Sequence, residues 1–121
     1  GETGTAEHAA DSSSRLDKQH FERYMHAEKP YLNPRLRITD ITEVLGTNRT
    51  YLSGFINRTY GMNFNRYINR LRLREVEKLR VNPDYTNISG LELVQKAGFA
   101  NFNAYQRIKE EEDKRSTLKL N

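Results

Sequence analysis

The sequence predicts an all-α protein in which two helix-turn-helix subdomains are joined by a long linker helix. From residue 16 onward, apolar residues recur at helical spacing, and no segment shows the alternation that a half-buried strand requires. A short helix, a glycine, a brief turn and a second helix occur twice, with DITEVLG (40–46) and ELVQKAG (92–98) in the short helices. Two short helices joined by a glycine-containing turn form a helix-turn-helix. One long helical segment separates the two copies.

The first lobe is expected to cover residues 15–63. Residues 1–14, which precede it, are small, polar and without period, so we expect a disordered leader there. The lobe opens with a helix that Pro30 and Pro34 bring to an end, because proline breaks a helix and favours turns. The face of this helix that should be buried carries Leu16, Phe21, Tyr24 and Met25.

The first helix-turn-helix follows within the same lobe. Its first helix covers about 38–45 and stops at Gly46. Its second helix begins at Asn48, whose side chain can accept a hydrogen bond from an exposed helix N–H. This helix runs to Tyr60, and Gly61 supplies the stop.

A linker helix is predicted over 64–81, and a second lobe over 82–113. The buried stripe of the linker comprises Phe64, Tyr67, Ile68, Leu71, Val76 and Leu79. NPDYTN (82–87) breaks the linker, and a helix over about 90–97 stops at Gly98. A last helix begins near Asn101 and runs into the acids EEED (110–113), which leaves 114–121 as a tail.

The composition excludes several classes of protein. The chain has 121 residues, 36% of them hydrophobic and 30% charged, which suits one small globular domain or two very small ones. Without cysteine there is no disulfide, thiolate metal site or thiol redox switch. No apolar run reaches the roughly 18 residues of a membrane span, and no signal peptide is visible. We therefore expect a cytoplasmic domain, either on its own or as the cytoplasmic part of a longer membrane-anchored protein.

Positive charge is concentrated in the middle of the chain. Residues 47–80 hold eight Lys/Arg against two Asp/Glu, whereas 1–46 is net negative and 81–121 is neutral. A concentrated basic surface is typical of proteins that bind polyanions. The six Lys/Arg of 66–80 fit phosphate contacts best, but docking on an acidic protein or a membrane, or packing between the lobes, stays open.

The helix from Asn48 carries a row of small polar residues that is unusual for a structural helix. Leu52, Phe55 and Ile56 have the spacing to pack inward, which leaves five residues outward: Arg49, Thr50, Ser53, Gly54 and Asn57. Glycine inside a helix costs about 1 kcal/mol relative to alanine, so Gly54 needs a reason. The second helix of a DNA-binding helix-turn-helix lies in the major groove.

Each of these outward residues can then be given a role. Asn57 can bind adenine with two hydrogen bonds, and Thr50 and Ser53 can contact bases. Gly54 would let the helix backbone approach the bases closely. Arg49 and Arg58 flank the row and would reach phosphates, which fixes the register without reading sequence.

Residues from about Pro30 to Glu112 resemble the DNA-binding domain of AraC/XylS-type transcription regulators. The resemblance lies in DITEVLGTNRTYLSGFINRTYGMNFNRYINRLRL and SGLELVQKAGFANFNAYQRIK. It implies a bacterial regulator with two homeodomain-like helix-turn-helix lobes on a rigid linker helix. It also implies double-stranded DNA as partner, RNA polymerase as a second partner, and a sensor or effector domain outside this chain. In the second lobe it points to Phe102, Asn103 and Gln106 for base reading and to Arg107 for a phosphate contact; Arg66 of the linker helix is a further candidate for a phosphate contact.

Three features depart from the family pattern. Ile108 directly precedes Lys109 where the family has a Phe-Lys pair, so a core aromatic is absent or the register is one residue shorter. EEEDKRSTLKLN stands in place of the family's closing segment and last helix. The acids 110–113 would repel phosphates unless they form a solvated helix end that points away. Gly90, where the repeat has Ile38, thins the core of this lobe. We therefore expect the second lobe to contribute less to DNA binding.

No catalytic set appears, and we expect neither a metal nor a cofactor. His8, His20 and His26 lie before the helix-turn-helix units, and no carboxylate cluster has metal-ligand spacing. No glycine-rich phosphate loop is present. The alternative to DNA binding is a degenerate helix-turn-helix that acts as a protein-interaction or dimerisation module.

Overall fold

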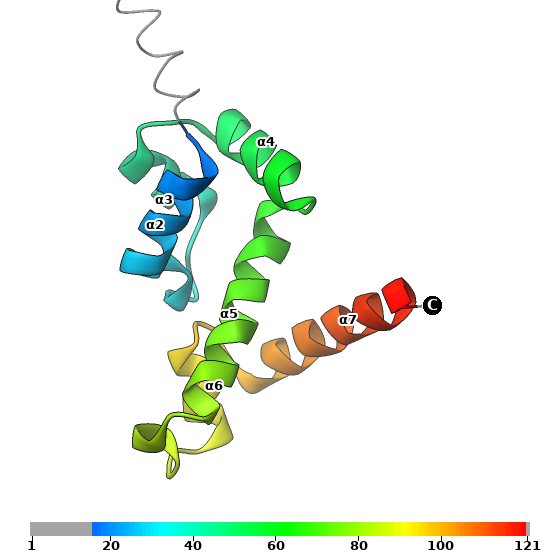
Figure 1. Cartoon of the computed structure of the whole chain (residues 1–121). Helices are drawn as coiled ribbons and strands as arrows, with labels where there is room; N and C mark the ends of the chain where they lie inside the picture. The colour runs from blue at the N-terminus through cyan, green and yellow to red at the C-terminus, as the bar shows by residue number, and fades with distance from the viewer. Residues whose placement is uncertain (1–15, 121) are drawn as a thin grey trace, which may run out of the picture. The chain divides into compact units, whose positions relative to one another are not determined.

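The computed structural model describes residues 16–120, and all regular elements within this range are helical (Figure 1). The predicted all-α class is therefore confirmed. The expected leader, 1–14, lies outside the described residues. In chain order the α-helices are α2 (Lys18–Glu28), α3 (Ile38–Leu45), α4 (Arg49–Tyr60), α5 (Phe64–Arg80), α6 (Gly90–Lys96) and α7 (Phe102–Leu120). Short 3₁₀ turns occupy Pro30–Leu32 (η1) and Pro83–Tyr85 (η2).

Local side-chain chemistry sets the ends of several helices. The Asn48 side chain accepts a hydrogen bond from the backbone N–H of Tyr51 at 3.0 Å, as predicted, and so caps α4. Ser89 caps α6 in the same way through the N–H of Glu92. At the other end, α3 and α4 stop at Gly46 and Gly61, also as predicted. Three residues, 46–48, join α3 to α4, which is compatible with a helix-turn-helix.

Packing divides the chain into two compact units. In the described range, unit 1 holds 16–30 and 36–67, and unit 2 holds 31–35 and 68–120. The boundary passes through α5, so this helix is not a separate part between the two predicted lobes. Residues 31–35 belong to unit 2 although the chain on either side of them belongs to unit 1.

The core of unit 1 is built by α2, α3 and α4 with the start of α5. Leu52 and Ile56 are fully buried and Phe55 nearly so, which confirms the predicted inner face of α4. From α2, Phe21 packs edge-on against Phe55, with ring centroids 5.2 Å apart. Tyr67 stacks on Tyr60 at 4.5 Å. Helix α2 is therefore an integral part of this lobe.

Tyr60 ties the end of α4 to α2 by a hydrogen bond. Its hydroxyl donates to Glu22 Oε2 at 2.8 Å. Burial of the ring, followed by this hydrogen bond, raises the pKa of Tyr60 far above its usual value. We expect Tyr60→Phe to lower the free energy of unfolding by about 0.5–1.5 kcal/mol, because it removes one hydrogen bond and leaves the packing in place. Urea unfolding of Tyr60→Phe beside Tyr51→Phe, at an exposed tyrosine, measures this; equal stability of the two variants would contradict it.

The core of unit 2 gathers around α5, α6 and α7. Val76 and Leu79 of α5 are buried against a cluster completed by Val94, Ala97, Phe99, Tyr105 and Ile108. Ile108 therefore occupies a core position without the aromatic residue of the family pattern. Next to Gly90, the ring of Phe102 fills part of the space that a larger residue would take, since a Cβ on Gly90 would lie 3.4 Å from Phe102 Cε1.

Within unit 2, segment 31–35 is held in place by contacts with Arg72 and Gly98. Arg72 Nε donates to the carbonyl oxygen of Tyr31 at 2.7 Å, and Nη2 donates to that of Asn33 at 2.8 Å. Gly98 adopts φ +103°, and a Cβ there would lie 2.2 Å from the same Tyr31 oxygen. The glycine of the AGF turn thus allows segment 31–35 to lie directly against the turn.

The structure corrects the prediction for the end of the chain. Residues 114–120, expected to form a tail, continue α7 to Leu120, so the acids 110–113 lie inside a helix and not at its end. The range Phe102–Leu120 contains no glycine or proline to stop the helix. Ion pairs between residues four positions apart also stabilise the extended helix, among them Lys109 with Asp113 at 2.8 Å and Arg107 with Glu111 at 3.9 Å.

Candidate nucleic-acid interface

Helix α4 presents three of the five residues of its predicted outward row to solvent. Arg49, Thr50 and Asn57 are exposed, whereas Ser53 and Gly54 are half-buried. Asn57 donates from Nδ2 to the carbonyl oxygen of Ser53 within its own helix, at 3.1 Å. This bond is neutral and exposed, so it is readily exchanged for another partner.

Gly54 is covered by a side chain of its own helix. The guanidinium of Arg58 lies over it, and a Cβ built on Gly54 would be 2.9 Å from Arg58 Nη1. Arg58, predicted to contact a phosphate, is exposed. A rotation of this side chain toward a phosphate would uncover Gly54.

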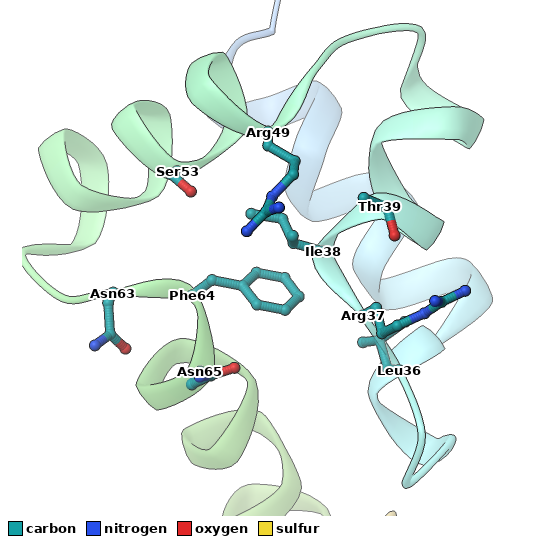
Figure 2. A pocket seen from close by; sticks show the side chains of 9 residues that line it. All are labelled: Leu36, Arg37, Ile38, Thr39, Arg49, Ser53, Asn63, Phe64 and Asn65. Atoms are coloured by element: carbon teal, nitrogen blue, oxygen red, sulfur yellow. The ribbon is translucent and has the colours of Figure 1, made fainter.

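A hollow of about 570 Å³ lies beside the start of α4 (Figure 2). Arg49 and Ser53 point from α4 toward the ring of Phe64 at the start of α5. The lining is completed by Leu36, Arg37, Ile38, Thr39, Asn63 and Asn65. All of these residues belong to unit 1.

The hollow has the electrostatic character of an anion site. Its lining includes two arginines and no aspartate or glutamate. The first residues of α3, α4 and α5 all contribute to it, and the unpaired N–H groups at a helix start carry partial positive charge. Asp40 lies nearby and accepts a hydrogen bond from the backbone N–H of Arg37, at 2.9 Å. Asp40 also lies 3.6 Å from the guanidinium of Arg37, so Arg49 and the helix starts are what favour a negatively charged group here.

The predicted residues of the second lobe lie on the first turns of α7. Phe102, Asn103, Gln106 and Arg107 are all exposed. Arg107 is 3.9 Å from Glu111, so a carboxylate of the acidic segment competes with any phosphate for it. The ring of Phe102 lies 5.5 Å from that of Tyr105, which limits its freedom to contact a base.

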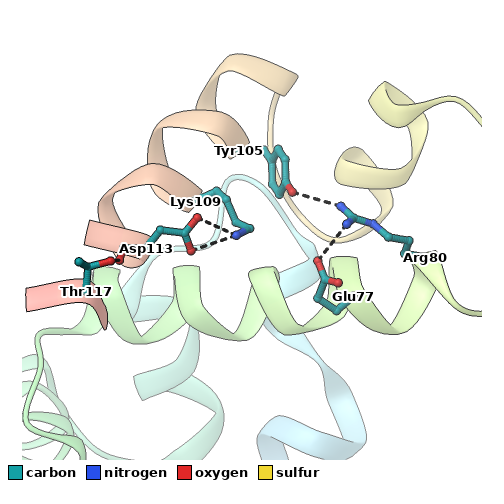
Figure 3. A network of polar contacts seen from close by, with 6 residues as sticks. All are labelled: Glu77, Arg80, Tyr105, Lys109, Asp113 and Thr117. Atoms are coloured by element: carbon teal, nitrogen blue, oxygen red, sulfur yellow. Dashed lines mark hydrogen bonds and ion pairs between the residues drawn. The ribbon is translucent and has the colours of Figure 1, made fainter. Parts of the chain in front are cut away.

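The basic residues of 66–80 fall into different groups. Arg72 is turned inward onto segment 31–35, and burial lowers the pKa of its guanidinium. Arg80 lies 3.6 Å from Glu77 and within hydrogen-bond distance of the Tyr105 hydroxyl (Figure 3). Arg66, predicted to contact a phosphate, is half-buried. Arg70, Arg74 and Lys78 remain for contacts outside the chain.

Sequence reasoning missed the hollow and the inward role of Arg72. Arg37, Asn63 and Asn65 were not among the predicted site residues, although each lies at the start of a helix where anions bind. Asn63 caps α5 by accepting the N–H of Arg66 at 2.9 Å, and a capping pattern is visible in a sequence. No comparable signal marks Arg72, whose partners are backbone carbonyls about forty positions away.

Residues 16–120 contain no group of three or more His, Cys, Asp or Glu arranged to hold a metal. Within the same range, no helix has both the length and the apolar character needed to cross a bilayer. No family model, curated protein or solved structure matches the chain.

Proposed function

We propose that this chain is a sequence-specific DNA-binding domain of the kind found in AraC-type transcription regulators, with α4 as its main reading helix. The observation that carries the proposal is the pairing, within unit 1, of a polar row on α4, of which Arg49, Thr50 and Asn57 are exposed, with a basic hollow whose lining contains no acid. Base contacts specify a site, whereas phosphate contacts position the protein. The polar row on α4 would supply the base contacts, and the hollow would supply a phosphate contact.

The roles follow from exposure and chemistry. Thr50 and Asn57 are exposed and would meet base edges, and Asn57 can bind adenine with two hydrogen bonds after it releases the Ser53 carbonyl. Arg49 points into the hollow, where a backbone phosphate would be held by its guanidinium and by the helix starts. RNA polymerase and a separate sensor domain complete the proposal as partners.

Selection of bound sites from a random duplex library tests this proposal, and substitutions then assign the roles. We expect Asn57→Ala to weaken binding to the selected site by about 1–3 kcal/mol and to leave binding to random duplex nearly unchanged. Arg49→Ala should weaken both alike, because a phosphate contact is blind to sequence. No enriched sequence in the selection would overturn the proposal, and an equal loss on all sequences would remove Asn57 from base reading.

A protein-interaction module is the second candidate function. It is favoured by the acids of α7, which engage Lys109 (Figure 3) and Arg107 and would repel any polyanion near that helix. A salt titration on duplex DNA separates the two candidates. Binding through phosphates weakens with a log–log slope of about −0.9 for each contact, whereas salt-insensitive binding, or none at 50 mM salt, would favour the protein partner.

A further inference from the structure

Helix α5 carries three cations in a row that the fold does not use. Arg70, Arg74 and Lys78 lie four positions apart; Arg70 is half-buried and the other two are exposed. We refer to these three residues as the cationic row. Val76, which is fully buried in the core of unit 2, is two positions from both Arg74 and Lys78. At 3.6 residues per turn, side chains two positions apart point to nearly opposite faces of a helix, so the row faces roughly away from that core.

No acid within residues 16–120 forms an ion pair with the cationic row. The two acids of α5 are directed elsewhere, because Glu75 is buried and Glu77 pairs with Arg80. Arg74 lines a hollow of about 380 Å³ together with Glu77 and Asp113. Asp113 is held there by Lys109 at 2.8 Å (Figure 3). The acids nearest to the row are thus already engaged.

Like charges four positions apart destabilise a helix. Glu75 and Glu77 lie between Arg74 and Lys78 in the sequence, but Glu75 is buried and Glu77 pairs with Arg80. Arg70, Arg74 and Lys78 therefore repel one another along α5, and no ion pair within residues 16–120 engages them directly. A polyanion bound along the row would turn this repulsion into attraction.

We propose that the cationic row is a second phosphate-contact surface, which binds the backbone of duplex DNA. This inference rests on the proposed function and extends it from α4 to α5. At 1.5 Å per residue the row spans about 12 Å, a length of duplex axis that contains three or four phosphates of one strand at about 3.4 Å of axial rise each. Arginine also binds phosphate through two hydrogen bonds at once. The row supplies affinity and carries no sequence information.

The test uses the full chain and a triple variant, Arg70→Gln/Arg74→Gln/Lys78→Gln. Binding to a random-sequence duplex is measured by fluorescence anisotropy between 50 and 200 mM salt. We expect the log–log slope to become shallower by about 0.9 for each lost contact, so by up to about 2.7, and the affinity at low salt to fall at least tenfold. The melting temperature should change little, because relief of the repulsion within α5 is offset by the loss of the favourable charge of Lys78 in the last turn of the helix.

Two further variants serve as controls. Lys18→Gln/Arg23→Gln/Lys114→Gln removes the same charge from exposed positions outside the row and should keep the wild-type slope. Arg70→Lys/Arg74→Lys preserves the charge and should keep most of the affinity. The inference is overturned if the row variant matches either the wild type or the first control. It is also overturned if the row variant loses binding to phosphatidylserine vesicles but not to DNA, which would assign the row to a membrane surface.

The outcome is distinguishable from that of the proposed function. If Asn57→Ala weakens binding to the selected site but not to random duplex, and the row variant keeps the wild-type dependence of binding on salt, then α4 reads DNA and the inference about α5 fails. If the row variant loses its slope and the library yields no preferred sequence, the row binds duplex DNA and the specific function fails.

Discussion

Gly98→Ala should destabilise the protein by about 3–5 kcal/mol, the largest loss expected from a single methyl group in this chain. Alanine is strained at the φ of +103° that Gly98 adopts, at a cost of about 1–3 kcal/mol. The added Cβ would also lie 2.2 Å from the Tyr31 carbonyl oxygen and 2.9 Å from Arg72 Nε. Because the Tyr31 oxygen is a backbone atom, segment 31–35 as a whole must move to relieve the clash. This movement weakens the 2.7 Å hydrogen bond that Arg72 donates to the same oxygen.

Urea unfolding followed by circular dichroism measures the loss. Gly90→Ala is the matched control, since its Cβ would meet only the Phe102 ring at 3.4 Å, an ordinary contact, at the first residue of α6. That variant should be as stable as the wild type or slightly more stable. A Gly98→Ala protein within about 0.5 kcal/mol of the wild type would show that segment 31–35 does not pack against the turn.

Gly54 should behave in the opposite way, because its substitution improves the fold and harms the proposed function. Gly54→Ala should raise the free energy of unfolding by about 0.5–1 kcal/mol, since alanine is the better helix former. The new Cβ would meet only the end of the flexible Arg58 side chain, at 2.9 Å, and this side chain can move aside at little cost.

Gly54→Leu should then abolish the close approach of α4 to base edges. Leucine is also a good helix former, so the variant should fold. We expect its affinity for the selected DNA site to fall at least a hundredfold, about 2.8 kcal/mol, with a smaller loss on random duplex. A stable Gly54→Leu protein that binds its site normally would mean that α4 does not enter the groove.

The elements predicted best are those whose signals are local. Asn48 caps α4, and Gly46 and Gly61 end α3 and α4, because each acts on backbone groups within its own turn. The buried face of α4 followed from the spacing of Leu52, Phe55 and Ile56. Helical period alone thus predicted the all-α class.

The candidate site was predicted less completely. Thr50 and Asn57 are exposed as expected, but Ser53 and Gly54 are half-buried. Exposure at these two positions depends on what lies beside α4. Arg58 lies over Gly54, and Ser53 lines the hollow that the starts of α3 and α5 complete. Periodicity places a residue on a helix face but does not say which neighbours cover it.

The sequence by itself determined the all-helical class, the glycine stops of α3 and α4, the Asn48 cap and the basic middle of the chain, because these depend on composition and on neighbours within one or two turns. Only the tertiary structure decided which basic residues remain available. Arg72 is turned inward by two backbone carbonyls of segment 31–35, and Arg80 is held by Glu77 and Tyr105. Arg70, Arg74 and Lys78 stay outward. Apart from the Glu77 pair, which has helical spacing, these contacts join residues 25 or more positions apart in the chain, for which charge and spacing carry no signal.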